Sequence, residues 1–382
     1  MRFSLIGPVF PYRGGIAHYT TMLYEALRQS GHDVQLISFR RQYPAFLFPG
    51  RSDKDPSQRP LRVDHACYWI DSLNPLTWLV TFTRINRYEP DVLILQWWTS
   101  FWAPVWLTLG ALTRLFSRRP LVYVCHNVLP HERRPWDLWL ARLALRWGTR
   151  FVVQSSDERD SLAKLLSTAD IDVVPHPIYD MFASQRIGTP EARVKLGLPV
   201  DIPILLFFGI VREYKGLEDL LAALPLVRQQ LEGVVLVVAG EFWEDRQPYE
   251  ATVRRLGLDD SVIFDDRYIP NEELPLYFCA ADALVAPYRE ATGSGAVQLA
   301  LGFNTPVLAS NACLSGEAGP ALDGVFPPQA PRAMAGAILS FFHEHSPGAA
   351  KVPTDPSDRG NGWRQLVRVL ENEGRIQEAS ES

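Results

Sequence analysis

The stretch ILLFFGIVREYKG, residues 204–216, is the part of the chain that most strongly decides its fold class. Its apolar first part predicts a buried strand, and residues 217–230 predict a helix. Gly209 allows a tight turn between the two, and a helix N-terminus favours a bound anion. Arg212 can hold two phosphate oxygens, and Lys215 adds a point charge. The stretch therefore predicts a phosphate-binding turn, with a surface loop that carries two solvated cations as the alternative.

The bulk properties of the chain favour a cytoplasmic protein of several domains. Its 382 residues are enough for two or three domains with sizeable cores. The net charge of −5 at pH 7 gives no basis for a nucleic-acid partner. The four cysteines lack the spacing of a zinc site or a disulfide framework, and the first residues do not read as a secretion signal. We therefore expect a cytoplasmic location and leave association with the inner face of the membrane open.

A tryptophan-rich stretch, residues 96–116, is close in length to a membrane span. It contains four tryptophans and no charge before Arg114, but Pro104 and several polar residues interrupt it. These interruptions favour a loop followed by a mostly buried helix. The alternatives are an aromatic surface that rests in a bilayer interface and, third, a spanning helix. The pairs 118–119 and 133–134 are arginines that could meet anionic headgroups, which would support peripheral membrane contact.

Strand-like and helix-like stretches alternate along the chain, which predicts an α/β protein with parallel sheets covered by helices. The pattern weakens in residues 175–203, where Pro, Gly and polar residues gather, so we place a domain junction there. The predicted domains are residues 1–180 and 181–360, and residues 361–382 form a helix that packs back toward the first domain. The expected strands are 3–7, 34–39, 92–95, 121–125, 151–154, 173–174, 204–208, 234–239, 262–264, 283–286 and 307–309. The expected helices are 15–30, 76–87, 136–147, 156–166, 217–230, 248–256, 271–281, 296–301, 332–343 and 355–373.

Three further loops follow predicted strands, where open α/β sheets bind their ligands. Gly14 and Gly15 end the first loop at a helix N-terminus and would let a ligand approach the backbone, with a flexible turn as the alternative. His126 ends a strand and can donate to a phosphate or a sugar hydroxyl, although a lone histidine more commonly has a packing role. Glu290 is a carboxylate at the start of the third loop. The same loop continues with Gly293, Ser294 and Gly295, whose backbone amides can hold a phosphate.

These motifs, taken in order, resemble a retaining glycosyltransferase of glycosyltransferase family 4, which has the GT-B fold. The resemblance covers nearly the whole chain and also includes Gly31-His32-Asp33-Val34, Gly257-Leu258 and Ala281-Asp282. It implies two Rossmann-like parallel-sheet domains that face an interdomain cleft. It also implies a first domain on the acceptor side and a second domain that binds the donor.

The resemblance assigns roles to the candidate residues. Arg212 and Lys215, with Gly209, would hold the donor diphosphate, and His126 would meet the donor sugar or its phosphate. Glu290 would be the first glutamate of the family's Glu-x7-Glu motif, which contacts the donor sugar. Arg267, Tyr268 and Ile269 would lie beside the base, and Gly14, Gly15, Gly293, Ser294 and Gly295 would contact donor phosphates or, for Gly14 and Gly15, the acceptor. His131 and Glu132, in the same loop as His126, are weaker candidates to orient an acceptor hydroxyl.

The chain departs from that motif at its second glutamate. The position falls on Gln298, or on Leu299 if the register is shifted by one. A glutamine can still hydrogen-bond a ribose hydroxyl and a leucine cannot, so the identity of the nucleotide is in doubt.

We expect transfer of a sugar, with retention, from a nucleoside-diphosphate sugar to a saccharide or lipid-linked acceptor. The setting implied is bacterial polysaccharide, lipopolysaccharide or glycolipid assembly. No Asp/Glu pair suited to double displacement and no metal-ligand cluster is evident, so we expect front-side transfer with no cofactor and no metal. The rivals are an epimerase of nucleoside-diphosphate sugars and a binding protein without transferase activity. The sequence leaves the sugar, the base, the acceptor and the oligomeric state open.

Overall fold

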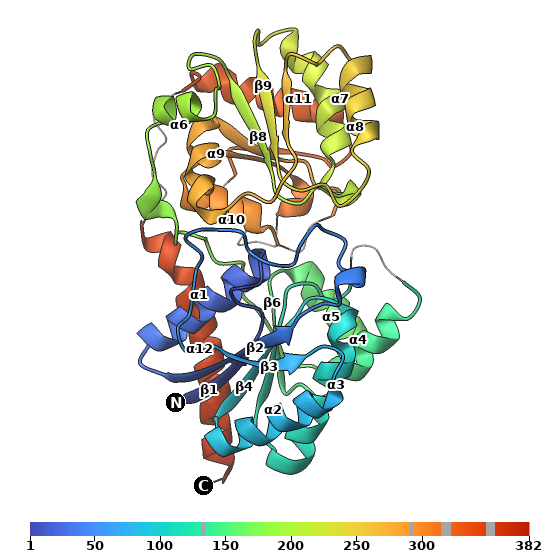
Figure 1. Ribbon diagram of the computed structural model, residues 1–382, viewed down its shortest axis with the longest axis vertical. Coiled ribbons are helices and arrows are strands. Elements are labelled where there is room, and N and C mark those ends of the chain that lie inside the picture. The colour runs from blue at the N-terminus through green and yellow to red at the C-terminus, as the bar shows by residue number, and fades with distance from the viewer. Residues whose placement is uncertain (131–133, 291–292, 315–321, 349–355, 382) are drawn as a thin grey trace. The chain divides into compact units, whose positions relative to one another are not determined.

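The computed structural model describes residues 1–130, 134–290, 293–314, 322–348 and 356–381, without the side chains of 356–360 and 376–381 (Figure 1). The chain divides into two compact units. Unit 1 consists of Met1–Asp55, Pro60–Pro175 and Asn361–Ser382, and unit 2 of Pro56–Arg59 and His176–Gly360. The main crossing from unit 1 to unit 2 follows Pro175, where we had placed the boundary after residue 180.

Unit 1 is built on a parallel sheet of seven described strands in the order β3-β2-β1-β4-β5-β6-β7. Its strands are β1 Arg2–Ile6, β2 Asp33–Arg41, β3 Cys67–Asp71, β4 Val92–Trp97, β5 Leu121–Cys125, β6 Arg150–Val153 and β7 Ile171–Val173. Its helices are α1 Gly15–Gln29, α2 Pro75–Tyr88, α3 Ala103–Leu112, α4 Asp137–Leu145, α5 Ser156–Leu165 and α12 Pro356–Glu381. The strand order reverses between β1 and β4, so the loops that follow these two strands lead away to opposite sides of the sheet. In open α/β sheets such a reversal leaves a crevice at the carboxyl ends of the strands.

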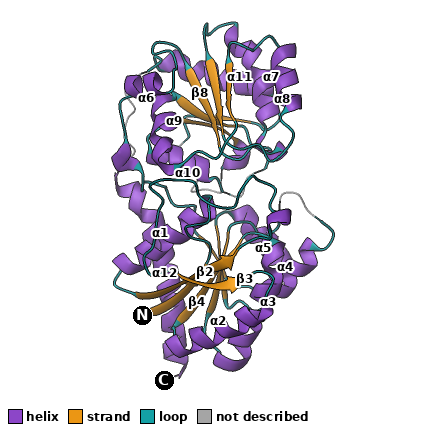
Figure 2. Cartoon of the chain, viewed as in Figure 1, coloured by secondary structure: helices purple, strands orange, loops and turns teal. Residues whose placement is uncertain are grey.

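Unit 2 repeats this architecture with six described parallel strands in the order β10-β9-β8-β11-β12-β13. Its strands are β8 Ile204–Phe208, β9 Val235–Ala239, β10 Val262–Asp265, β11 Ala283–Ala286, β12 Val307–Ser310 and β13 Gly324–Phe326. Its helices are α6 Thr189–Lys195, α7 Leu217–Arg228, α8 Gln247–Arg255, α9 Leu274–Ala280, α10 Gly295–Gly302 and α11 Pro331–Glu344. In each unit the strands form a central layer with helices around it, as Figure 2 shows. The predicted α/β class with two parallel-sheet domains is confirmed.

The tryptophan-rich stretch is core, as the favoured interpretation predicted. Trp97, Trp102 and Trp106 are at most 1% exposed, and the last two rings stack with centroids 5.7 Å apart. The helix is only the ten residues of α3, which a short π-helical turn, Thr113–Ser117, continues. No helix in the described part of the chain is long and apolar enough to cross a membrane.

Three elements escaped the sequence analysis. The strand β3 lies at the edge of its sheet and buries only Ile70 of its five residues, so it lacks an apolar run. The strand β13 is only three residues long. The helix α6 lies in the Pro- and Gly-containing stretch that we read as a junction, and Pro190 stands in its first turn, where proline is tolerated.

The C-terminal helix α12 packs on unit 1. The Nε2 atom of His32 lies 2.8 Å from an Oε1 atom of Glu371, and the ring of Trp363 packs on that of Tyr19 with centroids 5.0 Å apart. The sulfur and methyl groups of Met1 lie beside Gly374, where a Cβ would be 1.8 Å from the methyl carbon. The helix therefore completes unit 1 although about 185 residues of unit 2 precede it in the chain.

The loop between β2 and β3 contributes a short piece to unit 2. Ser57 Oγ accepts a hydrogen bond of 2.9 Å from the backbone N–H of Asn271, and the carboxylate of Glu272 accepts one of 2.9 Å from the N–H of Gln58. These contacts explain why residues 56–59 group with unit 2.

A buried ion pair joins α6 to the sheet of unit 2. The guanidinium of Arg193 is fully buried, donates to Asp282 at 2.8 Å and also donates to the carbonyls of Ala280 and Ile202. Asp282 also accepts from the backbone N–H of Ile204 at the start of β8. Both charges are hydrogen-bonded on several sides, which is the condition under which a buried pair is tolerated.

We predict that Arg193→Met lowers the free energy of unfolding by about 3–5 kcal/mol, because it leaves the Asp282 carboxylate buried without its partner. Urea unfolding followed by circular dichroism measures the change. The matched control is Lys195→Met, which removes the exposed i,i+4 pair with Glu191 on the same helix. The control should cost about 0.5 kcal/mol or less, and equal losses in the two variants would contradict the role given to Arg193.

Candidate functional site

The strand order of unit 2 reverses between β8 and β11, and the loops after these strands meet there. The backbone N–H of Arg289 donates to the carbonyl of Tyr214 at 2.7 Å. The first loop carries Arg212 and Lys215, and the second carries Glu290. The structure therefore brings together the basic turn and the start of the Glu290 loop, which are about 75 residues apart in the chain.

Glycine at position 216 permits the contact between the two loops. Gly216 has a φ of 68°, and a Cβ placed on it would lie 2.1 Å from the carbonyl oxygen of Pro287. Gly240 at the end of β9 is similar, since a Cβ there would lie 2.0 Å from the carbonyl oxygen of Gly209. The backbones approach so closely at these positions that a side chain would have to displace main-chain atoms.

Lys215 is a partly buried cation with no compensating carboxylate among the described residues. Its Nζ atom lies 5.2 Å from the centre of the Tyr288 ring and close to Gly209, where a Cβ would be 3.0 Å away. Burial lowers the pKa of Lys215 to about 8, the thiol of Cys313 opposes that change, and the charge of Arg212 adds to it. The ammonium group is therefore held where a negative ligand would stabilise it.

Arg212 lies among aromatic rings at the same turn. The centre of its guanidinium is 5.7 Å from the ring of Trp243 and 5.8 Å from that of Tyr214, within the range of cation–π contacts. Arg289 on the other loop differs, because it donates to Asp219 at 2.9 Å and to Glu213 at 3.2 Å. The charge of Arg289 thus stabilises the two loops, and the role of Arg212 and Lys215 in holding a ligand stays a prediction.

The N-terminus of α10 lies next to this turn. Ser294 caps the helix by accepting from the N–H of Val297 at 3.3 Å, and its hydroxyl lies 3.2 Å from that of Tyr288. Gly295 is the first residue of the helix, and Glu290 is exposed. The Tyr288 side chain thus contacts both the Ser294 cap of the helix and, through its ring, the ammonium group of Lys215. Positions 291–292 of the predicted loop lie outside the described residues.

Gln298 and Leu299, the two candidates for the second motif position, are both buried on α10. The Oε1 atom of Gln298 has no hydrogen-bond partner within the described structure, and its backbone carbonyl accepts from the N–H of Tyr179 at 3.3 Å. A buried amide oxygen without a partner is costly, so it is a candidate acceptor for a ligand hydroxyl.

The segment expected beside the base has a structural network of its own. The guanidinium of Arg267 donates to Asp265 at 2.9 Å, to Tyr277 at 3.0 Å and to Glu273. Ile269 is 4% exposed, and Tyr268 is partly buried. The side chain of Arg267 is therefore fixed by carboxylates before any ligand arrives, and its role beside a base stays a prediction.

In unit 1, His126 lies at the end of β5 with both ring nitrogens engaged. Its Nε2 atom is 2.6 Å from Gln96 Oε1, its Nδ1 atom is 3.4 Å from Gln154 Nε2, and the Tyr19 ring meets it edge-on. The network assigns the hydrogen to Nε2, which donates to Gln96 while Nδ1 accepts from Gln154. The ring is thus oriented by two amides, and its expected contact with a donor sugar stays a prediction.

Gly14 and Gly15 begin α1 at the reversal point of the first sheet. A Cβ on either glycine would meet nothing within 4 Å, so the backbone there is open to a ligand. His131 and Glu132, the other candidates in this unit, lie outside the described residues.

Sequence reasoning missed Gln96, Gln154, Trp243 and Cys313. Gln96 and Gln154 follow apolar runs at strand ends, and that position was the available signal. Trp243 and Cys313 carried no local signal, since their importance comes only from their approach to Arg212 and Lys215.

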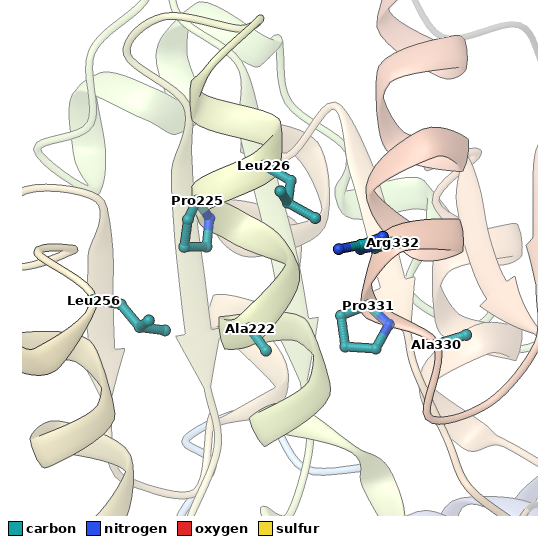
Figure 3. A pocket seen from close by; sticks show the side chains of 7 residues that line it. All are labelled: Ala222, Pro225, Leu226, Leu256, Ala330, Pro331 and Arg332. Atoms are coloured by element: carbon teal, nitrogen blue, oxygen red, sulfur yellow. The ribbon is translucent and has the colours of Figure 1, made fainter.

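The described residues hold no group of three or more His, Cys, Asp or Glu side chains arranged to bind a metal ion. Figure 3 shows an open apolar pocket of about 620 Å³ on the helices of unit 2, lined by Ala222, Pro225, Leu226, Leu256, Ala330, Pro331 and Arg332. Arg332 is its one charged side chain, so the pocket lacks the converging polar groups that orient a nucleotide or a sugar.

Both halves of the chain match models of glycosyltransferase domains. Residues 14–177 match a model described as glycosyl transferase 4-like domain, and residues 202–344 match one described as glycosyl transferases group 1. One similar protein is the GDP-mannose:glycolipid 4-beta-D-mannosyltransferase of Xanthomonas campestris pv. campestris, 28% identical over 212 residues, which are 53% of this chain and 54% of that protein. Another is the GDP-mannose-dependent alpha-(1-6)-phosphatidylinositol monomannoside mannosyltransferase of Mycolicibacterium smegmatis, 30% identical over 63% of this chain and 66% of that protein. The chain spans about half the length of the first curated relatives it matches.

Solved structures agree on the fold. Anabaena Alr3699/HepE in complex with UDP matches with a TM-score of 0.66 at 18% identity, over 100% of both chains. A glycosyltransferase from Rickettsia africae ESF-5 matches with a TM-score of 0.68 at 15% identity, over 98% of both chains. The two-domain fold is therefore GT-B.

We predict that Gly216→Ala destabilises the protein by more than the 1–2 kcal/mol that a left-handed backbone costs an L-residue, because its Cβ also displaces Pro287. Thermal unfolding of the purified variant measures the loss. The control is Gly336→Ala in α11, where a Cβ would meet nothing within 4 Å and alanine favours the helix. A Gly216→Ala variant as stable as the control would refute the tight approach of the two loops.

Proposed function

Because the chain belongs to the GT-B glycosyltransferase family whose two domain models it matches in order, we propose that it transfers a sugar from a nucleoside-diphosphate sugar to an acceptor hydroxyl. The observation that carries the proposal is the cationic turn after β8. Lys215 there has no described carboxylate partner, and its pKa is lowered to about 8 mainly by burial. A donor diphosphate would supply the missing negative charge.

The proposed reaction uses the two cations to stabilise the leaving group. The bond between the anomeric carbon and the β-phosphate oxygen breaks, and the diphosphate leaves with the bonding electrons. Arg212, Lys215 and the backbone amides at the α10 N-terminus stabilise the charge that grows on it. The acceptor oxygen bonds to the same face of the anomeric carbon, and its proton passes to the leaving phosphate oxygen, which gives retention.

Other candidate residues take supporting roles. The exposed carboxylate of Glu290 accepts hydrogen bonds from hydroxyls of the donor sugar, and the unpartnered Oε1 of Gln298 accepts one from the ribose. His126, whose ring is oriented by Gln96 and Gln154, is proposed to contact the transferred sugar or its phosphate. The mechanism draws on these side chains and on no metal ion or organic cofactor.

The acceptor class is proposed from the relatives. Their names specify a glycolipid acceptor in one case and a phosphatidylinositol monomannoside in another. We propose a saccharide or lipid-linked acceptor in polysaccharide, lipopolysaccharide or glycolipid assembly, with peripheral contact of the protein with the membrane. The same two names specify beta and alpha linkages, so retention is argued from the mechanism and not from the relatives.

Two rivals make different predictions. An epimerase would convert the donor with no acceptor present, and a binding protein would hold the nucleotide without releasing sugar. The names of the relatives, all of them transferases, favour transfer.

The first test is thermal unfolding with UDP, GDP, ADP and dTDP, each with and without EDTA. A nucleotide at about 100 times its Kd adds about 2.7 kcal/mol to the free energy of unfolding, which raises the midpoint by a few degrees. We expect one nucleotide to do this equally well with EDTA, and that result selects the sugars for a transfer assay. Arg212→Ala and Lys215→Ala should each lower transfer by about 100-fold or more.

The control for this test is Lys195→Ala, which removes a lysine of the same unit that is exposed and paired with Glu191. It should leave both the shift and the transfer rate unchanged. Full activity in either Lys215→Ala or Arg212→Ala would exclude the proposed site, and nucleotide binding without transfer to any acceptor would favour the binding protein.

The pKa of Lys215 adds a pH dependence. The ammonium form of Lys215 binds the diphosphate, and its pKa in the free protein is lowered to about 8. The affinity for the nucleotide is therefore at its maximum below pH 8. Above it, the Kd of the nucleotide should rise about tenfold per pH unit, and binding at pH 9 should take up nearly one proton. Calorimetry at pH 9 in buffers of different ionisation enthalpy measures this uptake. Lys215→Arg keeps its charge and should take up none, and equal uptake by both proteins would remove Lys215 from the diphosphate site.

A further inference from the structure

The outer helices of unit 1 form a layer that is unusually apolar on its solvent side. We define this helix layer as residues 73–88, 103–119 and 134–146, which contain α2, α3 with its π-helical turn, and α4. The central helix α3 packs against both α2 and α4, and all three cover one face of the sheet (Figure 1).

Exposed large apolar side chains concentrate on this layer. The described residues include seventeen such side chains, and nine of them belong to the layer: Leu73, Leu76, Leu79, Val80, Leu115, Phe116, Trp136, Leu138 and Trp139. Leu76 and Phe116 are 70% and 72% exposed, and the Phe116 ring reaches Phe82 of α2 with centroids 6.4 Å apart. The layer holds about one residue in eight of the chain, so a share of nine in seventeen is far above an even distribution.

The charge of the layer is opposite to that of the chain. It contains eight arginines, none of which forms an ion pair with a carboxylate of the described residues: Arg84, Arg87, Arg114, Arg118, Arg119, Arg134, Arg142 and Arg146. Its one carboxylate, Asp137, is buried and accepts hydrogen bonds from Ser100 and from the N–H of Arg134. The layer therefore carries a charge of about +7, whereas the chain as a whole carries −5.

Aromatic and basic groups are also paired at the surface. The guanidinium of Arg134 lies 5.8 Å from the ring of Trp136, which is 52% exposed, and that of Arg84 lies 4.6 Å from the ring of Trp69. Side chains of this kind, with apolar bodies and cationic ends, are typical of a surface that sits at the headgroup level of a bilayer.

We propose that the helix layer is the surface on which the protein docks to an anionic lipid bilayer. Exposed leucines and aromatic rings would enter the boundary of the acyl chains, and the arginines would meet lipid phosphates. A second copy of the chain is a poorer occupant, because a symmetric contact would oppose sixteen like charges. The inference rests on the peripheral membrane contact proposed above and specifies where that contact is made.

The layer overlaps only in part with the aromatic surface that the sequence analysis gave as an alternative for residues 96–116, since it shares Arg114, Leu115 and Phe116 with that stretch. Trp97, Trp98, Trp102 and Trp106 of the tryptophan-rich stretch are in the core and have no part in docking. Trp136 and Trp139, which the sequence did not distinguish from them, are exposed.

The test is flotation of the full-length chain with vesicles of phosphatidylcholine alone and of phosphatidylcholine with phosphatidylglycerol at a ratio of 7:3. We expect binding to the anionic vesicles only, weakening between 50 and 500 mM NaCl. The triple variant Arg114→Gln/Arg118→Gln/Arg142→Gln should bind about 100-fold more weakly, since each arginine near an anionic surface contributes about fivefold. Leu115→Ser/Phe116→Ser should lose the binding that remains at high salt.

The matched control removes three exposed arginines of unit 2, with Arg254→Gln/Arg255→Gln/Arg332→Gln. It should bind vesicles within about twofold of the unchanged protein. Equal weakening in the two triple variants, no binding of the unchanged protein to anionic vesicles, or a stable dimer whose formation depends on Leu115 and Phe116 would each overturn the proposal.

Nucleotide binding separates this inference from the proposed function. None of the layer residues belongs to the nucleotide site, so both layer variants should keep the thermal shift with the nucleotide. Vesicle binding without a thermal shift from any nucleotide would refute the proposed donor site and leave the docking surface supported. A thermal shift without vesicle binding would refute the docking surface and leave the donor site supported.

Discussion

Lys215 and Arg212 are held close together after β8, and this repulsive arrangement is the constraint on which the site depends. Burial and a neighbouring like charge both disfavour the ammonium form, and they lower the pKa of Lys215 to about 8. Gly209 and Gly216 permit the backbone of this turn, and the hydrogen bond between the carbonyl of Tyr214 and the loop after β11 holds it in place. Such strain is typical of a position that is stabilised only when a ligand supplies the missing charge.

The rest of unit 2 supports this turn. Arg193 and Asp282 anchor the starts of β8 and β11, the two strands whose opposite ends carry the site loops. Arg289 is neutralised by Asp219 and Glu213, which ties the second loop to the start of α7. Arg193 and Arg289, which stabilise the fold of this unit, are paired with carboxylates, whereas Lys215 has no carboxylate partner among the described residues.

In unit 1 the inner and outer faces of the helices carry different side chains. The inner faces of α2 and α3 fill the core with Trp78 and Trp106, while α2, α4 and the π-helical turn after α3 keep leucine, phenylalanine and arginine side chains in solvent. A helix that is apolar all round is normally buried. The exposed apolar side chains of α2, α4 and the π-helical turn are therefore the feature of this unit that the fold alone does not explain.

Much of the fold was predictable from local patterns. Apolar runs such as 204–208 and 121–125 became central parallel strands, and amphipathic stretches such as 15–30 and 332–343 became helices of nearly the expected length. The failures have physical causes: β3 is an edge strand with one buried residue, β13 is too short for a pattern, and α6 has a proline in its first turn and lies in a stretch with Pro and Gly. Among the site residues, the loops were found because parallel strands send their carboxyl ends to one edge of the sheet.

The sequence by itself determined the alternation of strands and helices, the turns at Gly209 and Gly216, and the cations at 212 and 215. These features are local, since hydrophobic periodicity and backbone freedom act over a few residues. Only the tertiary structure decided that Arg289 and Arg267 are neutralised while Lys215 is not, and that Gln96 and Gln154 orient His126. It also decided which tryptophans are buried and which face solvent. Burial, ion pairing and the pKa of a buried group depend on residues that meet in space from distant parts of the chain, and no local pattern records those meetings.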